Sequence, residues 1–508
     1  MTGADPLVLA VDQGTSSTKA LLVAADGRVV SRAAAPVGET QPHPGWVEQS
    51  ADELWHSVRR AVEDCVEPAM AARVCAIGLS TQRESLVLWE RRTGRALGPL
   101  VSWQDQRTTA QCRDLMATGA GPLVRSVSGM PLDPMFSALK ARWLLDTYDP
   151  DRRRSRAGEL CLGTVDSWLL SRFGREHVTE VGNASRTQLL DVSTGQWDDR
   201  LLELFGVPRA VLPRVVASAG DFPAARSLAP LPDGVPVRAV MGDSHAAMFA
   251  HAGWRPGVVK ATYGTGSSVM ALGDGDSPGL CRSIAWDITG PVFAVEGNIR
   301  AAGRTLSWLA ELFGTDVATL LAEAATAAPG GDVHLVPGFG GLGAPWWEPE
   351  AVAVLSGLTL GSRRGDLAAA GLAAIAFQVD DVLRAVEGAV GAVRLLLVDG
   401  GLTRSTRLMQ LQADLGGRRV ARSDEPDLSA LGVADAAAVA AGLCGFDDLE
   451  QRLRPAEEFH PAIGAADRTA LLAGWQRALR RALPDPSPAR QTDPAPAPTT
   501  DRAEANAG

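Results

Sequence analysis

The chain has 508 residues, which is too long for one hydrophobic core, so we expect two large domains. Its 46% apolar and 21% charged residues are typical of a globular protein, and its net charge of −10 argues against nucleic acid as a main partner. No apolar run approaches the roughly 20 residues that span a bilayer, and the start lacks the pattern of a signal peptide. We therefore expect neither a membrane nor a nucleic acid among its partners.

Cysteine usage gives the expected cellular setting. The 6 cysteines are widely scattered, and the sequence contains neither a CxxC pair nor an HExxH motif. This pattern argues against a zinc site and indicates a reduced, cytoplasmic protein.

The first elements in chain order are two short strands joined by a polar turn, within LVLAVDQGTSSTKALLV at residues 7–23. Consecutive apolar residues predict strands at 7–11 and 20–23, followed by a third strand at 28–33. Ser50 and Glu53 then form a capping-box signature ahead of a helix, and residues 75–79 predict a further buried strand. Three strands, a helix and a strand in this order are typical of an α/β fold.

The second half of the chain repeats this opening. VVKATYGTGSSVMAL at residues 258–272 again has a strand, a turn of glycines and hydroxyls, and a strand, which predicts two similar domains. We place them at 1–248 and 249–483. Residues 393–401 predict a buried strand that ends in an acid and two glycines, and helices are expected at 403–414 and 429–443. Residues 484–508 contain almost no large apolar residues and are expected to form a disordered tail.

The two polar turns have a common chemistry. A turn rich in glycine and hydroxyls after a buried strand directs N–H and O–H donors at phosphate oxygens, so two such turns predict a nucleoside triphosphate held between the domains. Asp12, just before the first glycine, suits Mg²⁺ held through water. The alternative for residues 12–18 is a plain hairpin turn, which the second turn and the DGG strand end make much less favourable.

A series of motifs in a fixed order resembles the FGGY carbohydrate kinases, and within that family most resembles the glycerol kinases. The series runs through DQGTSSTKALL (12–22), PGWVEQSADELW (44–55), STQRESLVLWE (80–90), WQDQRT (103–108), GMPLDPMFSALKARWLLD (129–146), GTVDSWLL (163–170), NASRTQLLDV (183–192), GDSHAAMF (242–249), YGTGSS (263–268), GFGGLGAPWWEP (338–349) and VDGG (398–401). The resemblance implies an α/β, actin-like ATPase fold, with two ribonuclease-H-like domains around a nucleotide cleft. It also implies ATP-dependent phosphorylation of a sugar or polyol hydroxyl.

The resemblance assigns the nucleotide side of the site. It implies that the phosphates and the metal meet Asp12, Thr15, Ser16, Ser17 and Lys19, and that the nucleotide is lined by Thr265, Gly303, Ser307, Gly401 and Ser405. Lys19 replaces the arginine that is usual in glycerol kinases and so loses the fork geometry. Ser307 and Ser405 stand where those enzymes have Gln and Asn. ATP and Mg²⁺ are the implied cofactors, with Asp12 and Asp243 as metal ligands.

The acceptor side carries more information. Arg83 and Glu84 match the pair that holds the polyol, Trp103 matches an aromatic wall, and Asp243 matches the general base. The alternatives are a surface ion pair for Arg83 and Glu84, and a helix N-cap for Asp243. His245 is better explained as a structural residue than as a catalytic one.

Three positions depart from glycerol kinases on the acceptor side. Met135 replaces Tyr, Ser244 replaces Gln after the base, and Ser268 replaces Phe. These changes remove hydrogen-bonding groups and one packing wall, while the phosphate chemistry is unchanged. We therefore expect an acceptor longer than glycerol, such as a four- or five-carbon polyol or a pentulose, with Met135 and Ser244 in contact with it.

Other functions stay open at this point. The chain would be a glycerol kinase proper, or a pentulose kinase such as a xylulokinase, if the three substitutions were neutral. An actin-like ATPase that acts on protein partners would have no use for Asp243 and the QRE motif. A kinase-like regulator of transcription would need a DNA-binding segment, and none precedes residue 7. The sequence leaves open whether the chain forms a homodimer or a homotetramer.

Overall fold

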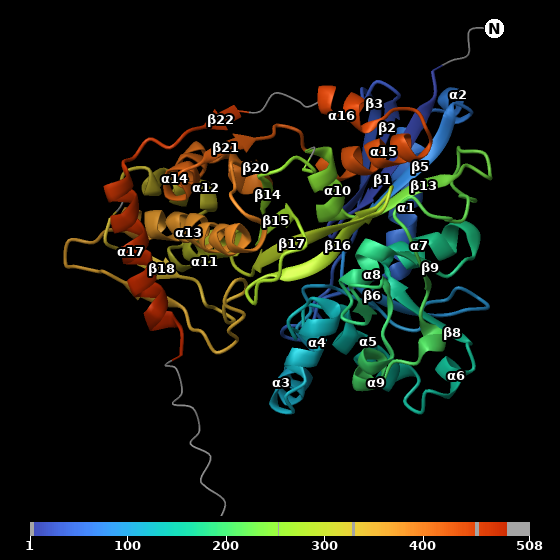
Figure 1. The fold of residues 1–508 in the computed structure, drawn as a ribbon, viewed down its shortest axis with the longest axis horizontal. Helices are drawn as coiled ribbons and strands as arrows, with labels where there is room; N and C mark the ends of the chain where they lie inside the picture. Colours follow the sequence, from blue (N-terminus) through green and yellow to red (C-terminus); the bar gives the residue numbers. More distant parts are fainter. Residues whose placement is uncertain (1–4, 252, 328–330, 453–456, 485–508) are drawn as a thin grey trace, which may run out of the picture.

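A computed structural model describes residues 5–251, 253–327, 331–452 and 457–484. Two large sheets dominate the structure, and a smaller sheet with its own helices lies below the first (Figure 1). We call the two large sheets the first and the second sheet. The tail expected to be disordered lies, apart from residue 484, outside the described residues.

The first sheet contains the strands that the opening of the sequence predicts. β1 pairs antiparallel with β2 and parallel with β5, and β5 pairs parallel with β13. Across the sheet the strands are β13 (Val237–Gly242), β5 (Val74–Thr81), β1 (Leu7–Gln13), β2 (Ser17–Ala24) and β3 (Val29–Pro36). All three opening strands are confirmed, with ends shifted by a few residues.

The second sheet repeats this topology. β14 pairs antiparallel with β15 and parallel with β20, and β20 pairs parallel with β21. The order β21-β20-β14-β15-β17 therefore matches β13-β5-β1-β2-β3, which confirms the internal duplication. The strands are β16 (Cys281–Asp287), β17 (Pro291–Ile299), β15 (Ser267–Leu272), β14 (Val258–Tyr263), β20 (Leu395–Asp399), β21 (Arg419–Arg422) and β22 (Glu457–Phe459).

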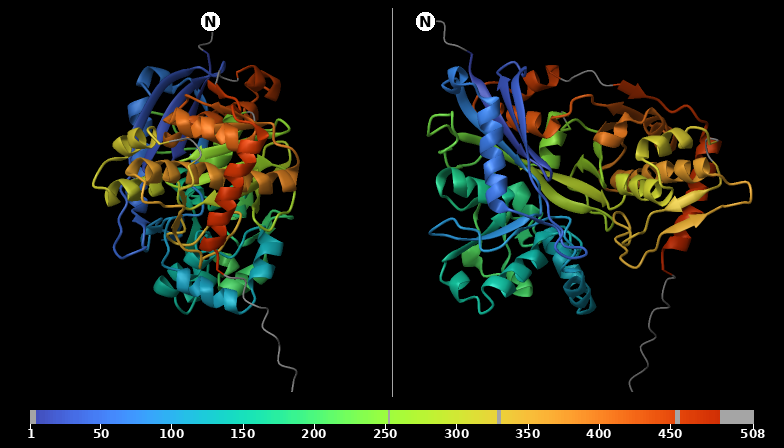
Figure 2. Two further views of the ribbon diagram at one scale, coloured as in Figure 1. Left: turned by 90° about the vertical axis from the view of Figure 1, so that its left-hand side faces the viewer. Right: turned by 180° about the vertical axis from the view of Figure 1, so that it is seen from behind.

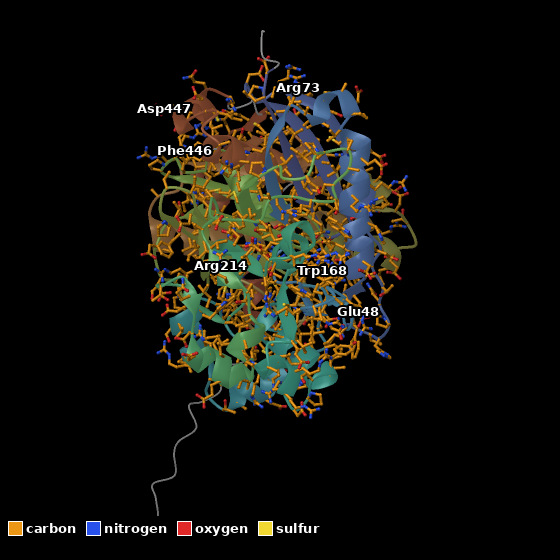
Figure 3. All side chains as sticks on the ribbon, turned by 90° about the vertical axis from the view of Figure 1, so that its right-hand side faces the viewer. Glu48, Arg73, Trp168, Arg214, Phe446 and Asp447 are labelled. Atoms are coloured by element: carbon orange, nitrogen blue, oxygen red, sulfur yellow. The ribbon has the colours of Figure 1, made fainter. Side chains whose placement is uncertain are left out.

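Helix α1 (Ala51–Cys65) covers the outer face of the first sheet (Figure 2). Ser50 accepts a hydrogen bond from the Glu53 backbone N–H at 3.3 Å, so the hydroxyl half of the expected capping box is present. The helix buries an apolar stripe that includes Leu54, Val58 and Val62. At its start, Trp168 of α7 (Val165–Gly174) donates to the Ala51 carbonyl at 3.2 Å (Trp168 is labelled in Figure 3).

Two short helices join the sheets. α15 (Leu428–Ala440) comes late in the sequence but lies against the first sheet beside α10 (Asp243–Ala250), as the orange and blue segments in Figure 1 show. A Cβ on Gly432 would lie 1.8 Å from the Ala246 carbonyl oxygen, and one on Gly78 would lie 2.4 Å from the Val433 carbonyl oxygen. The small residues of α15 are therefore required by close backbone approach.

The third sheet and the helices around it carry several of the acceptor motifs. Its strands are β4 (Glu48–Gln49), β7 (Leu100–Val101), β6 (Leu86–Glu90) and β8 (Leu160–Thr164). Short pairs form between β9 (Val178–Glu180) and β12 (Arg214–Val216), β10 (Leu190–Asp191) and β11 (Gln196–Trp197), and β18 (His334–Val336) and β19 (Val354–Ser356). The remaining helices of this half are α2 (Pro68–Ala71), α3 (Thr109–Ala117), α4 (Gly121–Ser128), α5 (Ser137–Tyr148), α6 (Arg153–Arg156), α7 (Val165–Gly174), α8 (Val181–Ser185) and α9 (Asp199–Phe205).

The second sheet is covered by helices of the C-terminal half. The segment expected as a helix at 403–414 forms a 3₁₀ turn at Gly401–Arg404 and then α14, because the Ser405 side chain caps the helix only there. The helices are α11 (Gly303–Leu312), α12 (Val317–Ala324), α13 (Arg364–Val390), α14 (Thr406–Gly416) and α17 (Ala465–Ala482). The short helix α16 (Phe446–Gln451) lies instead near β3 of the first sheet (Figure 1). Phe446 of α16 packs on Phe249 and Trp254 (Phe446 is labelled in Figure 3).

In the described ranges, no helix combines the length and the apolar character needed to cross a membrane.

Candidate active site

The predicted residues of the first half gather at one edge of the first sheet. β1, β5 and β13 run parallel, so their carboxyl ends lie together. Asp12 lies near the end of β1, Arg83 follows β5, and Asp243 follows β13 as the first residue of α10. In the second sheet the same edge carries the turn after β14 and the glycines after β20.

The first polar turn is anchored to its surroundings through side chains. Ser80 donates to Asp12 Oδ1 at 2.8 Å, and Trp103 Nε1 donates to Thr15 Oγ1 at 3.1 Å. Burial, and to a smaller extent the nearby Asp243, raise the Asp12 pKa to about 6. The turn that was predicted to meet phosphate is thus in direct contact with the predicted acceptor wall.

Lys19 makes a contact that the sequence did not indicate. Its ammonium pairs with Asp427 at 3.0 Å and donates to the Pro426 carbonyl at 3.1 Å, both next to the start of α15. Its side chain remains 33% exposed. Ser16 is exposed and Ser17 is half-buried, so all three side chains remain accessible to a ligand.

The nucleotide residues of the second half also come together. Gly303 N–H donates to the Gly264 carbonyl at 3.0 Å, and a Cβ on Gly303 would lie 2.8 Å from that oxygen. Gly400 has φ of +97°, and a Cβ there would lie 2.4 Å from the Tyr263 carbonyl oxygen. The turn at Thr265, the start of α11 and the turn at Gly401 therefore form one surface at the edge of the second sheet.

Ser307 and Ser405 lie in the helices that begin at this surface. The Ser307 hydroxyl donates to the Gly303 carbonyl at 3.3 Å, and the Ser405 hydroxyl accepts from the Leu408 N–H at 3.3 Å. Helix N-termini present unpaired N–H groups and a positive dipole end to anions. Ser405 is the N-cap of α14, and Ser307 is the fifth residue of α11, one turn after Gly303.

Arg83 and Glu84 are buried, with 6% and 5% exposure, so they are not a surface ion pair. Arg83 donates through both terminal nitrogens to Glu296 of β17, each at 2.8 Å. Its Nε lies 3.5 Å from Asp243 Oδ1 and has no hydrogen-bond partner among the described residues. Glu84 has φ of 63° and accepts from Arg186 Nε at 2.6 Å.

Asp243 opens α10, while Gly242 takes the N-cap position that was the alternative for Asp243. Its carboxylate is 34% exposed and accepts from the Ser244 backbone N–H at 2.6 Å. Burial raises the Asp243 pKa, and the guanidinium of Arg83 partly offsets this. The group is therefore a reachable carboxylate that faces an unpaired donor.

His245 is fully buried, with Nε2 3.5 Å from Arg83 Nη1. Burial and the neighbouring Arg83 charge hold its pKa well below the usual value, so the ring is neutral. A neutral, enclosed imidazole agrees with the structural role expected for it.

The remaining acceptor residues are held by a lysine that the sequence analysis did not single out. The ammonium of Lys140 on α5 is fully buried and donates to the backbone carbonyls of Trp103, at 3.4 Å, and Met135. Burial lowers its pKa to about 8. Met135 packs with the apolar cluster of Met130, Phe136 and Trp347.

Lys140, Arg186 and Glu296 are site residues that the sequence analysis did not single out. Lys140 and Arg186 lie inside the motifs quoted above, whereas the signal for Glu296 is one acid within the apolar strand PVFAVEGNI.

Asp12 and Asp243 fit a Mg²⁺ ion that also binds phosphate. The Asp243 carboxylate is close enough to raise the pKa of Asp12, and a divalent cation would relieve this repulsion. In the part of the chain that the structure describes, no three His, Cys, Asp or Glu side chains form a complete metal site. Mg²⁺ usually keeps several waters and binds through one or two carboxylates plus phosphates, which agrees with this arrangement.

Comparisons with known proteins show the family of the chain. The chain matches the FGGY family of carbohydrate kinases, N-terminal domain, over residues 7–250 and C-terminal domain over 259–441. It is 39% identical to a glycerol kinase of Geobacter sp. (strain M21) over 490 residues, covering 94% of this chain and 98% of that protein. A glycerol kinase of Methylobacterium nodulans is 41% identical over 502 residues, covering 95% and 99%.

Solved structures agree in fold. Plasmodium falciparum glycerol kinase with ADP has a TM-score of 0.87 at 26% identity, covering 94% of this chain and 98% of that one. A ligand-bound xylulose kinase from Lactobacillus acidophilus has a TM-score of 0.83 at 18% identity, covering 94% and 97%, which shows the fold alone.

Two sheets of one topology, with glycine-rich turns at the corresponding edges and a reachable carboxylate between them, define a phosphotransferase with the actin-like ATPase fold. The chain belongs to the FGGY family of carbohydrate kinases, enzymes that phosphorylate an alcohol group.

Proposed function

We propose that this kinase transfers the γ-phosphoryl group of ATP to one hydroxyl of a small polyol or ketose, with Asp243 as general base. The observation that carries the proposal is the unpaired Arg83 Nε beside the Asp243 carboxylate, since one acceptor hydroxyl can bind both. Asp243 takes the hydroxyl proton, the acceptor oxygen bonds to the γ-phosphorus, and the bond to the β-phosphate oxygen breaks to release ADP.

The two halves of the chain would bind different parts of the two substrates. Residues 1–248 would bind the acceptor and the phosphates, and residues 249–483 would bind the nucleotide. The phosphates would lie between the turns at 12–18 and 263–268, against Thr15, Ser16, Ser17 and Lys19. Thr265, Gly303, Ser307, Gly401 and Ser405 would line the nucleotide at the edge of the second sheet.

Asp12 and Asp243 would hold Mg²⁺, which neutralises charge on the transferring phosphoryl group when bound. Phosphoryl transfer depends mainly on positioning and on charge stabilisation. The contribution of this chain is therefore to exclude water and to align the acceptor oxygen. The hydrogen bond from Ser80 would orient the Asp12 carboxylate to hold the metal ion.

For the acceptor, we propose a molecule longer than glycerol. Met135 contributes an adaptable apolar side chain, and the Ser268 hydroxyl is directed to Glu296 at 3.0 Å. Trp103 and Ser244 would contact the acceptor, and Arg83, Glu84 and Asp243 would bind its reactive end.

Glycerol itself is the second candidate, because the curated relatives at about 40% identity over 94% of the chain are named glycerol kinases. A pentulose such as xylulose is a third, and it has only the shared fold in its favour.

The six cysteines are free, which supports the expected cytoplasmic setting.

The test is phosphotransfer from ATP to glycerol, erythritol, ribitol, xylulose and ribulose. We expect kcat/KM to be higher for a four- or five-carbon acceptor than for glycerol. A clear preference for glycerol would contradict the proposed acceptor but not the reaction. ATP turnover that no polyol or ketose stimulates would contradict the reaction and favour an actin-like ATPase.

The base is tested by Asp243→Asn. A positioned base contributes about 10²- to 10⁴-fold in rate, so kcat should fall by that order while circular dichroism and melting temperature stay near wild type. Near-normal turnover would exclude Asp243 as the base.

A further inference from the structure

A glutamate of the second sheet completes the acceptor pocket of the first half. Glu296 on β17 is fully buried and accepts from both terminal nitrogens of Arg83 at 2.8 Å. Arg186 Nη1 lies 3.1 Å from the same carboxylate. Arg83 follows β5 of the first sheet and Arg186 follows α8, so one carboxylate joins three parts of the fold.

Further donors complete the surroundings of Glu296. Ser268 Oγ donates to it at 3.0 Å and Asn298 Nδ2 at 2.9 Å, and the pairing of β15 with β17 places these two residues opposite each other. Burial of a charge is costly unless it is paired and hydrogen-bonded. Here the two guanidinium groups hold the Glu296 pKa well below its usual value against the effect of burial. The carboxylate is therefore ionised and fully engaged.

This anchoring determines where Arg83 points. With both terminal nitrogens bonded to Glu296, Nε is the guanidinium nitrogen left without a hydrogen-bond partner within the described residues, and it lies 3.5 Å from Asp243. Arg186 is held by the same carboxylate, and it donates from Nε to Glu84 Oε1 at 2.6 Å. That contact holds the Glu84 carboxylate in place. An unpaired buried donor is unfavourable in the free protein, and a bound hydroxyl removes this penalty.

We propose that Glu296 is a positioning residue for the acceptor: by anchoring Arg83 and Arg186, it aims Arg83 Nε and Glu84 at the acceptor hydroxyls. The inference rests on the proposed function. It makes acceptor recognition by the first half depend on a strand of the second sheet, the sheet that carries the nucleotide surface. Glu296 does not touch the reacting atoms and is not a base.

A purely structural role would give different results. If the ion cluster only held the fold together, its loss would lower stability and leave the affinity of the remaining folded enzyme for its acceptor unchanged. If Glu296 positions Arg83, the loss appears in acceptor binding even in folded enzyme, and binding of ATP is unaffected. The two roles are therefore separated by comparing the KM for the acceptor with the KM for ATP.

The experiment is Glu296→Gln, which keeps the shape of the side chain and removes its charge. Arg83 then has Asp243 as a nearby carboxylate, at 3.5 Å, and is drawn away from its position. We expect acceptor kcat/KM to fall by about 100-fold, with a rise of at least about tenfold in acceptor KM and an ATP KM within about twofold of wild type. Calorimetric titration of the acceptor should show the same loss of affinity. Glu296→Asp, which keeps the charge, should recover part of it.

Asp381→Asn is a matched control, because Asp381 is also a buried acid of the C-terminal half but is bonded to Trp475 at 2.7 Å. It should change stability and leave both KM values within about twofold. If Glu296→Gln does not fold, Ser268→Ala removes one hydrogen bond from Glu296 and should still raise the acceptor KM about threefold.

The inference would be overturned if folded Glu296→Gln kept an acceptor KM and an acceptor affinity within twofold of wild type. If Glu296→Gln does not fold, the same result in Ser268→Ala would overturn it. A wild-type enzyme that phosphorylates no polyol or ketose would instead overturn the proposed function, so the two failures are distinct.

Discussion

At the scale of single residues, the proposed acceptor site is built from charged side chains that are almost entirely paired with each other. Arg83 uses its terminal nitrogens for Glu296 and keeps Nε for a ligand, and Lys140 holds the backbone of Trp103 and Met135. Such pairing keeps each group rigid, which limits the entropy that is lost when an acceptor binds. Specificity should therefore depend on the few side chains that face the acceptor without a partner of their own.

Met135→Tyr tests this at the position that departs most clearly from glycerol kinases. A tyrosine hydroxyl adds a hydrogen-bonding group and shortens the pocket, so we expect kcat/KM for glycerol, relative to the best longer acceptor, to rise about tenfold or more. The measurement is the ratio of the two kcat/KM values. Met135→Leu, which conserves volume, should leave the ratio unchanged. An unchanged ratio in Met135→Tyr would mean that this side chain does not limit acceptor length.

At the scale of secondary-structure elements, the contact between α10 and α15 joins the two halves. It depends on backbone approach, because Gly432 meets the Ala246 carbonyl and Gly78 meets the Val433 carbonyl with no room for a Cβ. α10 also begins with Asp243, and the Ser429 hydroxyl of α15 donates to the Asp243 carbonyl at 3.0 Å. Displacement of α15 should therefore also move Asp243, the proposed base.

Gly432→Ala should lower stability by about 1–3 kcal/mol, because the new methyl group overlaps a carbonyl that cannot rotate away. Gly388→Ala is the matched control in a helix: it lies on the exposed face of α13, where a Cβ meets nothing within 4 Å. There alanine should stabilise the protein by about 0.5–1 kcal/mol. Thermal unfolding of both variants gives the comparison, and equal effects would contradict the packing argument.

At the scale of the whole molecule, binding of the two substrates should be coupled. The proposed nucleotide surface belongs to the second sheet and the acceptor residues to the first, and Glu296 connects them. The first ligand to bind would order contacts that the second then uses. We expect the rise in melting temperature with an ATP analogue and the acceptor together to exceed the sum of the separate rises. A purely additive response would show that the halves bind independently.

Stability should also depend on pH through buried acids. Burial raises the Asp381 pKa to about 7, whereas an unfolded Asp titrates near about 4. Between these values the native state holds a proton that the unfolded state releases, so this contribution is complete below about pH 4 and is lost as pH rises to about 7. Each unit of pKa shift corresponds to about 1.4 kcal/mol. Melting temperatures from pH 5 to 7 should fall less steeply in Asp381→Asn than in wild type, and identical slopes would contradict the assignment.

The sequence alone determined the succession of strands and helices that opens each half and the duplication, and it predicted residues that the structure brings together at one edge of the first sheet. Apolar runs and capping residues are local signals, so β1, β2, α1 and β14 could be predicted within a few residues. The site residues at strand ends followed from the motifs, because parallel strands bring Asp12, Arg83 and Asp243 to one edge. The helix at 403–414 was less accurate, because the side-chain cap at Ser405 decides its start.

Only the tertiary structure showed which charged side chains are already bonded to other groups of the protein. Glu296 and Arg186 are far in sequence from their partners, and Lys140 is 37 residues from Trp103, whose carbonyl it contacts. A charged residue in an apolar strand has no local signal that names its partner. The contact of α15 with the first sheet was equally unpredictable, because its small residues fit many surfaces and only the neighbouring backbone selects one. Ion pairing and close packing depend on distance in space, and the fold alone sets that distance.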